Sequence, residues 1–268
     1  MSEDIWKSAR GARASEPTRP SNAKSKELRL HGLNAVLALF DKSPERLRKL
    51  YLAETRLTDL KAVLKWCVQH RVGYRVVEEG DLAKLAQTSH HEGVVADVAP
   101  PTELDLITWL ASIEDAKSAC AIWLDGVGNP HNLGAILRNA AHFGVRAVLI
   151  ESVAINPISG ASARVAEGGA ECIQVVRLPA DAKHAIQALH AAGFSLAATL
   201  VREGADLFNT ALPDKLIYVM GAEQQGMHKG LANACDLRVS IPGTGAVESL
   251  NVASATAVFL SEWYRRRD

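Results

Sequence analysis

Between residues 118 and 268, short apolar runs alternate with segments of helical periodicity, and this alternation predicts an α/β fold. The expected strands are residues 121–125, 147–151, 173–176, 194–200, 216–220 and 237–241. Helices are expected between them, at 135–143, 161–169, 182–192 and 229–234, with a final helix over 252–264. Because strands that alternate with helices form crossover connections, we predict a parallel sheet covered on both faces.

A smaller α/β unit is predicted over residues 27–98. Apolar periodicity indicates helices at 32–40, 57–70 and 79–86, and β-branched or alternating runs indicate strands at 50–53, 74–77 and 94–98. Pro100 and Pro101 open a linker over 99–117, because consecutive prolines hold an extended backbone. We therefore expect two separate cores joined by this linker.

The first 26 residues are rich in Ser, Pro, Ala, Lys and Arg and have no apolar periodicity, which predicts a disordered tail. A length of 268 residues with 48% hydrophobic residues is sufficient for two domains, and no window resembles a membrane span. The four cysteines form no Cys-x-x-Cys pair, which favours a reducing compartment, with cytoplasm as the expectation, and no metal site.

Thirty basic residues balance thirty acidic residues, so any nucleic-acid contact must come from a local patch. One basic cluster consists of Lys42, Arg46, Arg48 and Lys49. It is interpreted either as a solvated face or as a phosphate contact.

The loop after the first strand of the larger unit admits a dinucleotide-binding interpretation. Gly126 and Gly128 follow a strand, and Glu151 ends the next strand, where an acid that binds ribose would lie. His131 occupies the place where a third glycine should allow close helix packing, and this counts against a dinucleotide site. Because the two glycines and Glu151 still fit the pattern, a nicotinamide-dependent oxidoreductase is kept as an alternative.

A second loop, over residues 242–248, joins the last strand to the last helix. Pro242 ends the strand, Gly243 and Gly245 permit an open backbone, and Ser249 or Asn251 can cap the helix. Such a loop either presents main-chain groups to a ligand or is an ordinary connection.

Three segments taken together resemble the three motifs of the SpoU family of RNA 2′-O-ribose methyltransferases, in the SPOUT superfamily. They are residues 132–140, residues 218–227, and residues 241–242 with 249–252, and the resemblance covers residues 121–263. Residues 28–98 look like the substrate-binding domain that often precedes this fold. The resemblance implies a trefoil knot in the C-terminal domain, S-adenosylmethionine as cofactor, RNA as partner, and a homodimer formed through the final helix, residues 252–264.

The resemblance also implies the site residues. The cofactor would be held largely by main-chain groups at Gly221, Ile241 and Leu250, with Met220, Gly226 and Pro242 beside them. The catalytic candidates are Arg138, Asn132, Glu223, Ser249 and Asn251. Arg138 lies six residues after Asn132, and we expect both side chains to face one cleft. Because a guanidinium stays protonated, our hypothesis is that Arg138 anchors the target phosphate and stabilises the emerging alkoxide.

Two departures from the family pattern affect the cofactor site. Gly243 stands where a methionine is common, and Gln224 with Gln225 stands where a glycine commonly follows the glutamate. The predicted activity is 2′-O-ribose methylation of RNA, with ribosomal RNA favoured over transfer RNA because of the N-terminal domain. A catalytically inactive RNA-binding protein of the same fold is the second alternative.

Overall fold

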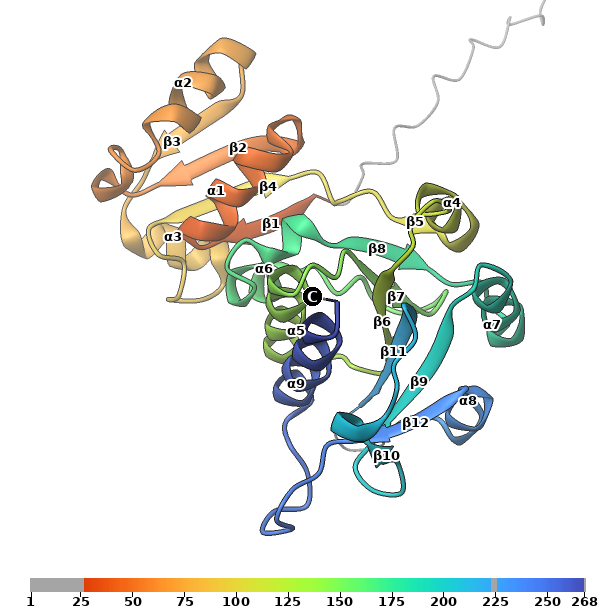
Figure 1. The fold of residues 1–268 in the computed structure, drawn as a ribbon. Helices are drawn as coiled ribbons and strands as arrows, with labels where there is room; N and C mark the ends of the chain where they lie inside the picture. Colours follow the sequence, from red (N-terminus) through yellow and green to blue (C-terminus); the bar gives the residue numbers. More distant parts are fainter. Residues whose placement is uncertain (1–26, 223–225, 268) are drawn as a thin grey trace, which may run out of the picture.

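The structure is a computed structural model that describes residues 27–222 and 226–267. The predicted disordered tail, residues 1–26, and Glu223 lie outside the described residues. The described chain forms two β-sheets, a mixed sheet of four strands and a parallel sheet of eight strands (Figure 1). In these residues no helix is both long and apolar enough to cross a membrane.

The smaller sheet has the order β1-β4-β2-β3. Its strands are β1 (Leu28–His31), β2 (Leu47–Leu52), β3 (Gly73–Val76) and β4 (Val94–Val98). Strand β4 runs antiparallel to both β1 and β2, whereas β3 pairs parallel with β2. The helices of this part are α1 (Leu33–Lys42), α2 (Lys61–His70) and α3 (Glu79–Ala86), with short 3-10 helices η1 (Pro44–Arg46) and η2 (Glu54–Arg56). Because side chains alternate along β4, Ala96 joins the cluster under α1 and Val95 packs with Leu82 of α3.

The larger sheet has the order β10-β12-β9-β11-β6-β7-β8-β5, and every neighbouring pair is parallel. Its strands are β5 (Leu104–Asp105), β6 (Ala119–Asp125), β7 (Ala147–Ile150), β8 (Gln174–Arg177), β9 (Ser195–Leu200), β10 (Ala205–Asp206), β11 (Lys215–Gly221) and β12 (Leu237–Ser240). The predicted parallel α/β sheet is confirmed, and the knot stays a prediction.

Helices cover both faces of the larger sheet (Figure 1). On one face lie α5 (Pro130–His142), α6 (Gly160–Val165), the 3-10 helix η3 (Gly169–Cys172) and α9 (Val252–Arg265). On the other lie α4 (Leu106–Ser112), α7 (Ala182–Ala191) and α8 (Lys229–Ala234), and η4 (Leu207–Asn209) follows β10. Strand β6 alternates between the two clusters, with Ile122 in the first and Trp123 in the second. This double burial explains why the strands are continuous apolar runs.

Two segments differ from the expected elements. The helix expected over 161–169 ends at Val165, because Gly168 adopts φ +90° and starts a separate turn into η3. Residues 104–112, expected within a linker, form β5 and α4. Leu106 and Trp109 are buried against the larger sheet, so this stretch packs as part of the larger unit.

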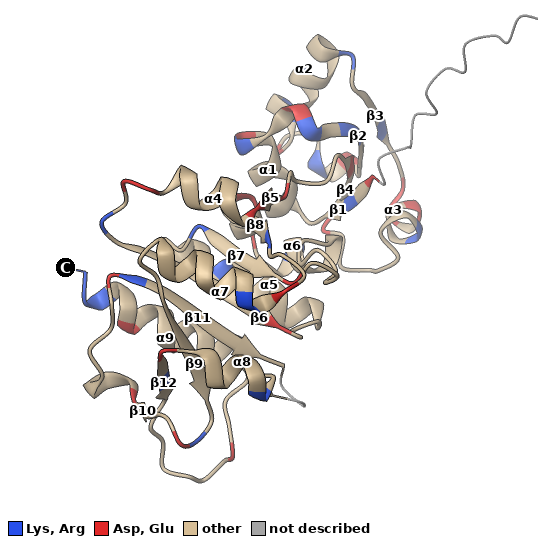
Figure 2. Cartoon of the chain, turned by 90° about the vertical axis from the view of Figure 1, so that its right-hand side faces the viewer, with Lys and Arg blue, Asp and Glu red and all other residues tan. Residues whose placement is uncertain are grey.

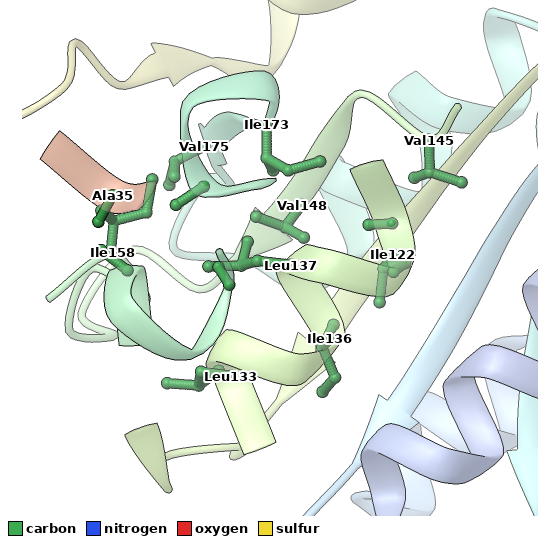
Figure 3. Close-up of a cluster of buried hydrophobic side chains, with 14 of the residues drawn as sticks. Ala35, Ile122, Leu133, Ile136, Leu137, Val145, Val148, Ile158, Ile173 and Val175 are labelled. Atoms are coloured by element: carbon green, nitrogen blue, oxygen red, sulfur yellow. The ribbon is translucent and has the colours of Figure 1, made fainter. Parts of the chain in front are cut away.

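The expectation of two separate cores is wrong. One cluster of buried side chains includes Leu30, Ala35 and Val36 of the smaller part together with Leu137 and Val175 of the larger part. Figure 3 shows Ala35 beside Ile158, in the same cluster as Leu133 and Ile173. The two sheets therefore share apolar packing that the Pro100–Pro101 connection did not reveal.

Candidate active site

A cavity of about 650 Å³ lies at the carboxyl ends of β9, β11 and β12. Its walls come from the last two residues of β9 and residues 201–202 after it, from the end of β11 and the turn that follows it, and from residues 241–252. Ala255 and Phe259 of α9 complete the walls. All six residues predicted to contact the cofactor line this cavity: Gly221, Ile241, Leu250, Met220, Gly226 and Pro242. The structure therefore gathers segments that are far apart in the sequence.

The turn after β11 brings main chain to the cavity wall. A Cβ atom on Gly221 would collide with the backbone of Gly226 and Met227, so only glycine fits there. The N–H of Gly226, at φ +66°, donates to the carbonyl oxygen of Ala222 at 2.8 Å. Glu223, a catalytic candidate, belongs to this turn but lies outside the described residues.

Asn251 caps α9. Its Oδ1 accepts hydrogen bonds from the N–H groups of Ala253 at 2.9 Å and Ser254 at 3.3 Å, which satisfies two donors of the first helical turn. Ser249, the other predicted cap, lines the cavity together with Asn251 and leaves the capping to it. The residues from 243 to 250 are exposed to solvent.

The first turn of α5 meets the start of α9. Asn129 caps α5 by accepting from the N–H of His131 at 2.9 Å, and Pro130 stands at the first helical position. The buried Asn132 then accepts a hydrogen bond at its Oδ1 from Nδ2 of Asn251, at 2.9 Å. Two predicted catalytic residues are thus in direct contact.

Arg138 does not join them. Its side chain is exposed, forms no hydrogen bond or ion pair with any residue in the described ranges, and does not line the cavity of its own chain. The expectation that Asn132 and Arg138 face one cleft is not met within a single chain. Six residues of α-helix correspond to roughly 600° of rotation, so the two side chains leave α5 in different directions.

Beside the turn after β11 lies a polar group to which none of the three sequence motifs points. Asp125, at the end of β6, is buried and accepts two hydrogen bonds from His228, one from the backbone N–H and one involving ring Nδ1, both at 2.7 Å. The hydrogen bond and the negative charge of Asp125 raise the pKa of His228. An aspartate at the carboxyl end of an apolar strand was the available signal.

The carboxylate of Glu151 lies near this pair. One atom each of Asp125, Glu151 and His228 that could coordinate a metal ion lies within 4.8 Å of the other two. Both oxygens of Asp125 already accept hydrogen bonds from His228. These contacts describe a hydrogen-bonded pair that fixes the end of the turn next to the cavity. Gly126 and Gly128, the basis of the dinucleotide alternative, do not line that cavity.

The four residues of the basic cluster do not form one exposed surface, because Arg46 is turned into a contact with Glu171. Arg46 is mostly buried and bonded to Glu171, Lys42 pairs with Asp41, and Arg48 donates to the carbonyl oxygen of Glu45. Figure 2 shows the positions of basic and acidic residues interspersed along the ribbon of both parts of the chain.

Comparison with known proteins identifies both parts. Residues 119–261 match the SpoU rRNA methylase family, and residues 29–104 match the family described as RNA 2′-O ribose methyltransferase substrate binding. The chain is 34% identical to a 23S rRNA (guanosine-2′-O-)-methyltransferase RlmB of Vibrio vulnificus, over 89% of this chain and 96% of that protein. It is 35% identical to an uncharacterized tRNA/rRNA methyltransferase, YfiF, of Escherichia coli O157:H7, over 91% of this chain and 69% of that protein.

Solved structures share the fold. The SpoU methyltransferase AviRb from Streptomyces viridochromogenes, in complex with AdoMet, aligns with a TM-score of 0.74 at 23% identity and covers 90% of each chain. An AdoMet-bound rRNA methyltransferase from Sinorhizobium meliloti aligns with a TM-score of 0.75 at 23% identity, over 90% of this chain and 87% of that one. The order of the three motifs, the loops they form and these matches together mean that the chain belongs to the SpoU family of RNA 2′-O-ribose methyltransferases.

Proposed function

We propose that this protein transfers a methyl group from S-adenosylmethionine to a ribose 2′-oxygen of ribosomal RNA. The observation that carries the proposal is the cavity of about 650 Å³ whose walls are the loops of the second and third motifs. Relatives named as 23S rRNA (guanosine-2′-O-)-methyltransferases favour ribosomal RNA over transfer RNA. The cytoplasm, where ribosomal RNA is found, is the proposed location.

The residues of the cavity fit S-adenosylmethionine. The volume lies within the range of about 300–1,000 Å³ that is usual for small-molecule sites. Met220, Ile241 and Leu250 offer apolar contacts, and the glycine turn brings main-chain donors and acceptors close to a ligand. Arg202 and Glu248 are the charged members among the described lining residues, and their opposite signs suit a zwitterionic amino acid group.

When bound, S-adenosylmethionine supplies an electrophilic methyl group on a sulfonium. The chain would then align the ribose 2′-oxygen with that methyl group and stabilise the charge that develops on the oxygen. The proton of the 2′-hydroxyl would pass to water or to a phosphate of the RNA, and S-adenosylhomocysteine would leave. Because an arginine does not give up its proton, we assign Arg138 to anchoring the target phosphate and the emerging alkoxide. Asn132, Ser249 and Asn251 would orient the ribose, and the same role is proposed for Glu223.

Arg138 lies outside the cavity of its own chain, and this supports a dimer as the active form. In a two-fold dimer built on the larger sheet, motif loops of both subunits would lie near each cavity. Helix α9 uses most of its apolar surface within its own chain, since Phe259, Leu260 and Trp263 are buried. The dimer contact would therefore involve its remaining face, which includes Ser254 and Ser261.

Calorimetry with S-adenosylmethionine and a methyl-transfer assay on ribosomal RNA test the function. We expect binding, transfer of labelled methyl groups, and loss of one ribose methylation in RNA from cells that lack the protein. If the protein bound RNA but neither bound the cofactor nor transferred methyl groups, the alternative of a catalytically inactive RNA-binding protein would replace the proposal.

A further inference from the structure

A short segment of the larger part packs against the smaller part. It consists of residues 167–172, and we call it the interface segment. It leaves α6 through Glu167 and Gly168, both at positive φ, and continues into η3. In Figure 1 this region, next to α6, lies against the smaller part. The interface segment contacts α1 and η1 of that part through three separate residues, Glu167, Gly168 and Glu171.

Each of the three contacts is specific. Nδ2 of Asn34 donates to Oε2 of Glu167 at 2.6 Å. A Cβ atom on Gly168 would lie 2.9 Å from Cβ of Ala38, so α1 packs directly on the backbone there. An ion pair joins Arg46 Nη1 and Glu171 Oε2 at 2.6 Å. These contacts fix α1 and η1 against the interface segment.

The other side of the same segment touches the backbone of Arg138. A Cβ atom on Gly169 would lie 3.0 Å from Cα of Arg138 and 3.1 Å from the carbonyl oxygen of Leu137. Because such contacts are close, a displacement of the interface segment would also displace this turn of α5. Arg138, the proposed RNA anchor, and the smaller part therefore both pack against the interface segment.

The ion pair in this interface is shielded from water. The side chains of Arg46 and Glu171 are 14% and 5% exposed, and Nε of Arg46 also donates to the carbonyl oxygen of Ala99 at 3.0 Å. Removing one member of a buried pair leaves the other charge without compensation, which is strongly destabilising, so the two side chains must stay together in the folded state. The pair thus suits a role in fixing the orientation of the two parts.

We propose that the Arg46–Glu171 pair and the interface segment hold the RNA-binding part at a fixed position relative to Arg138, and thereby select which ribose reaches the cavity. The inference rests on the proposed function, since it concerns the placement of the same RNA. Arg46 and Glu171 are positioning residues in this account, because they act through the interface segment and not by touching the reacting atoms.

The rival explanation is that Arg46 simply contacts RNA phosphate. The two explanations predict opposite results for Glu171→Arg, which adds positive charge. A phosphate-contact role predicts that this substitution leaves RNA binding unchanged or strengthens it. A positioning role predicts that Glu171→Arg and Arg46→Glu are both harmful, and that the doubly reversed pair restores activity.

The experiment compares the full-length protein with Arg46→Glu, Glu171→Arg and the double variant. We expect cofactor affinity to stay within about twofold, and kcat/KM for RNA to fall by about tenfold to a hundredfold in each single variant, because small misplacements of a reacting group are costly. Ribose methylation mapping should show loss of selectivity for the target nucleotide. The double variant should recover most of the kcat/KM for RNA and most of the selectivity for the target nucleotide. Unchanged kcat/KM and unchanged selectivity in Glu171→Arg would overturn the proposal.

A second variant disturbs the same interface without changing charge. Ala38→Trp places a large side chain against Gly168 and should displace α1, with the same loss of selectivity and intact cofactor binding. If Ala38→Trp methylates the same nucleotide at the same rate, the fixed geometry is not needed and the inference is wrong. Absence of cofactor binding in the unaltered protein would instead refute the proposed function, so the two failures are distinguishable.

Discussion

Asn251 and Asn132 are 119 positions apart in the sequence, and their side chains are joined by a hydrogen bond of 2.9 Å. The bond links the cap of α9 to the first turn of α5, so the third motif is fixed to the first beside the cavity. Since Asn132 is buried, its amide oxygen relies on a protein partner in place of water.

Replacing Asn251 with alanine should destabilise the protein, because it removes the cap of α9 and the donor to Asn132. We expect a loss of about 1–3 kcal/mol in the free energy of unfolding, measured by urea denaturation. Asn251→Asp keeps an oxygen for the cap but cannot donate to Asn132, so its loss should be smaller. Equal stability of Asn251→Ala and the unaltered protein would show that the contact does not stabilise the fold.

Arg138→Ala should strongly reduce methyl transfer. Cofactor affinity should be retained, because the exposed guanidinium lies outside the cavity of its own chain. We expect kcat/KM for RNA to fall by at least about a hundredfold, as is typical when a preorganised donor is lost from a transition state. Arg138→Lys keeps the charge but loses the planar fork, and should recover only part of the activity. Full activity in Arg138→Ala would exclude the anchor role.

The Asp125–His228 pair predicts a pH-dependent contribution to stability. Asp125 raises the pKa of His228 in the folded protein above its usual value of 6.5, so the folded state binds this proton more tightly than the unfolded state. The contribution is fully present below the unfolded pKa and is lost as the pH rises through the raised pKa. The Tm difference between the unaltered protein and His228→Gln should therefore be larger near pH 6 than near pH 8.5.

Asp125→Asn provides the control for the previous prediction, because it keeps the shape of the side chain and removes the charge that raises the pKa. The Tm of Asp125→Asn relative to His228→Gln should depend little on pH over the same range. If the Tm difference between these two variants also changed with pH, the pH dependence would come from other titratable groups.

Gly134 lies in α5 where that helix meets α6. A Cβ atom on it would be 2.5 Å from the carbonyl oxygen of Ser162 and 2.6 Å from Cβ of Val165. Gly134→Ala should therefore destabilise the fold by about 1–3 kcal/mol, although alanine normally favours a helix interior. Gly230→Ala in α8 is the matched control, since its Cβ would meet nothing within 4 Å and the substitution should not destabilise the fold. Unfolding by denaturant separates the two effects.

The sequence was sufficient for the larger sheet because its central strands are buried on both faces and form continuous apolar runs. It was not sufficient for β5 and α4, since a strand of 2 residues and a helix of 7 residues are too short for a periodic signal. The candidate site could be anticipated because three motifs of one family occur in order along the chain. The six proposed cofactor residues all line one cavity.

The contact between the two parts could not be anticipated. It consists of glycines such as Gly168, small side chains such as Ala38, and one ion pair between Arg46 and Glu171. Each of these looks like an ordinary surface residue until the chain is folded. The direction of the Arg138 side chain also differs from the expectation, because six residues of α-helix turn it away from the Asn132 side chain.

The last prediction concerns the dimer. Phe259 is 2% exposed and packs against Tyr218, so Phe259→Asp would disrupt the fold and would not report on an interface. Ser261 lies on the exposed side of α9, and Ser261→Arg should break a dimer formed there while leaving the monomer folded. Light scattering should change from about twice 28.8 kDa to a single chain, with loss of methyl transfer. Ile107→Arg is the control, because Ile107 is an exposed residue of α4 on the opposite face of the sheet. It should change neither the mass from light scattering nor methyl transfer. A fully active monomer in the unaltered protein would refute the proposed dimer.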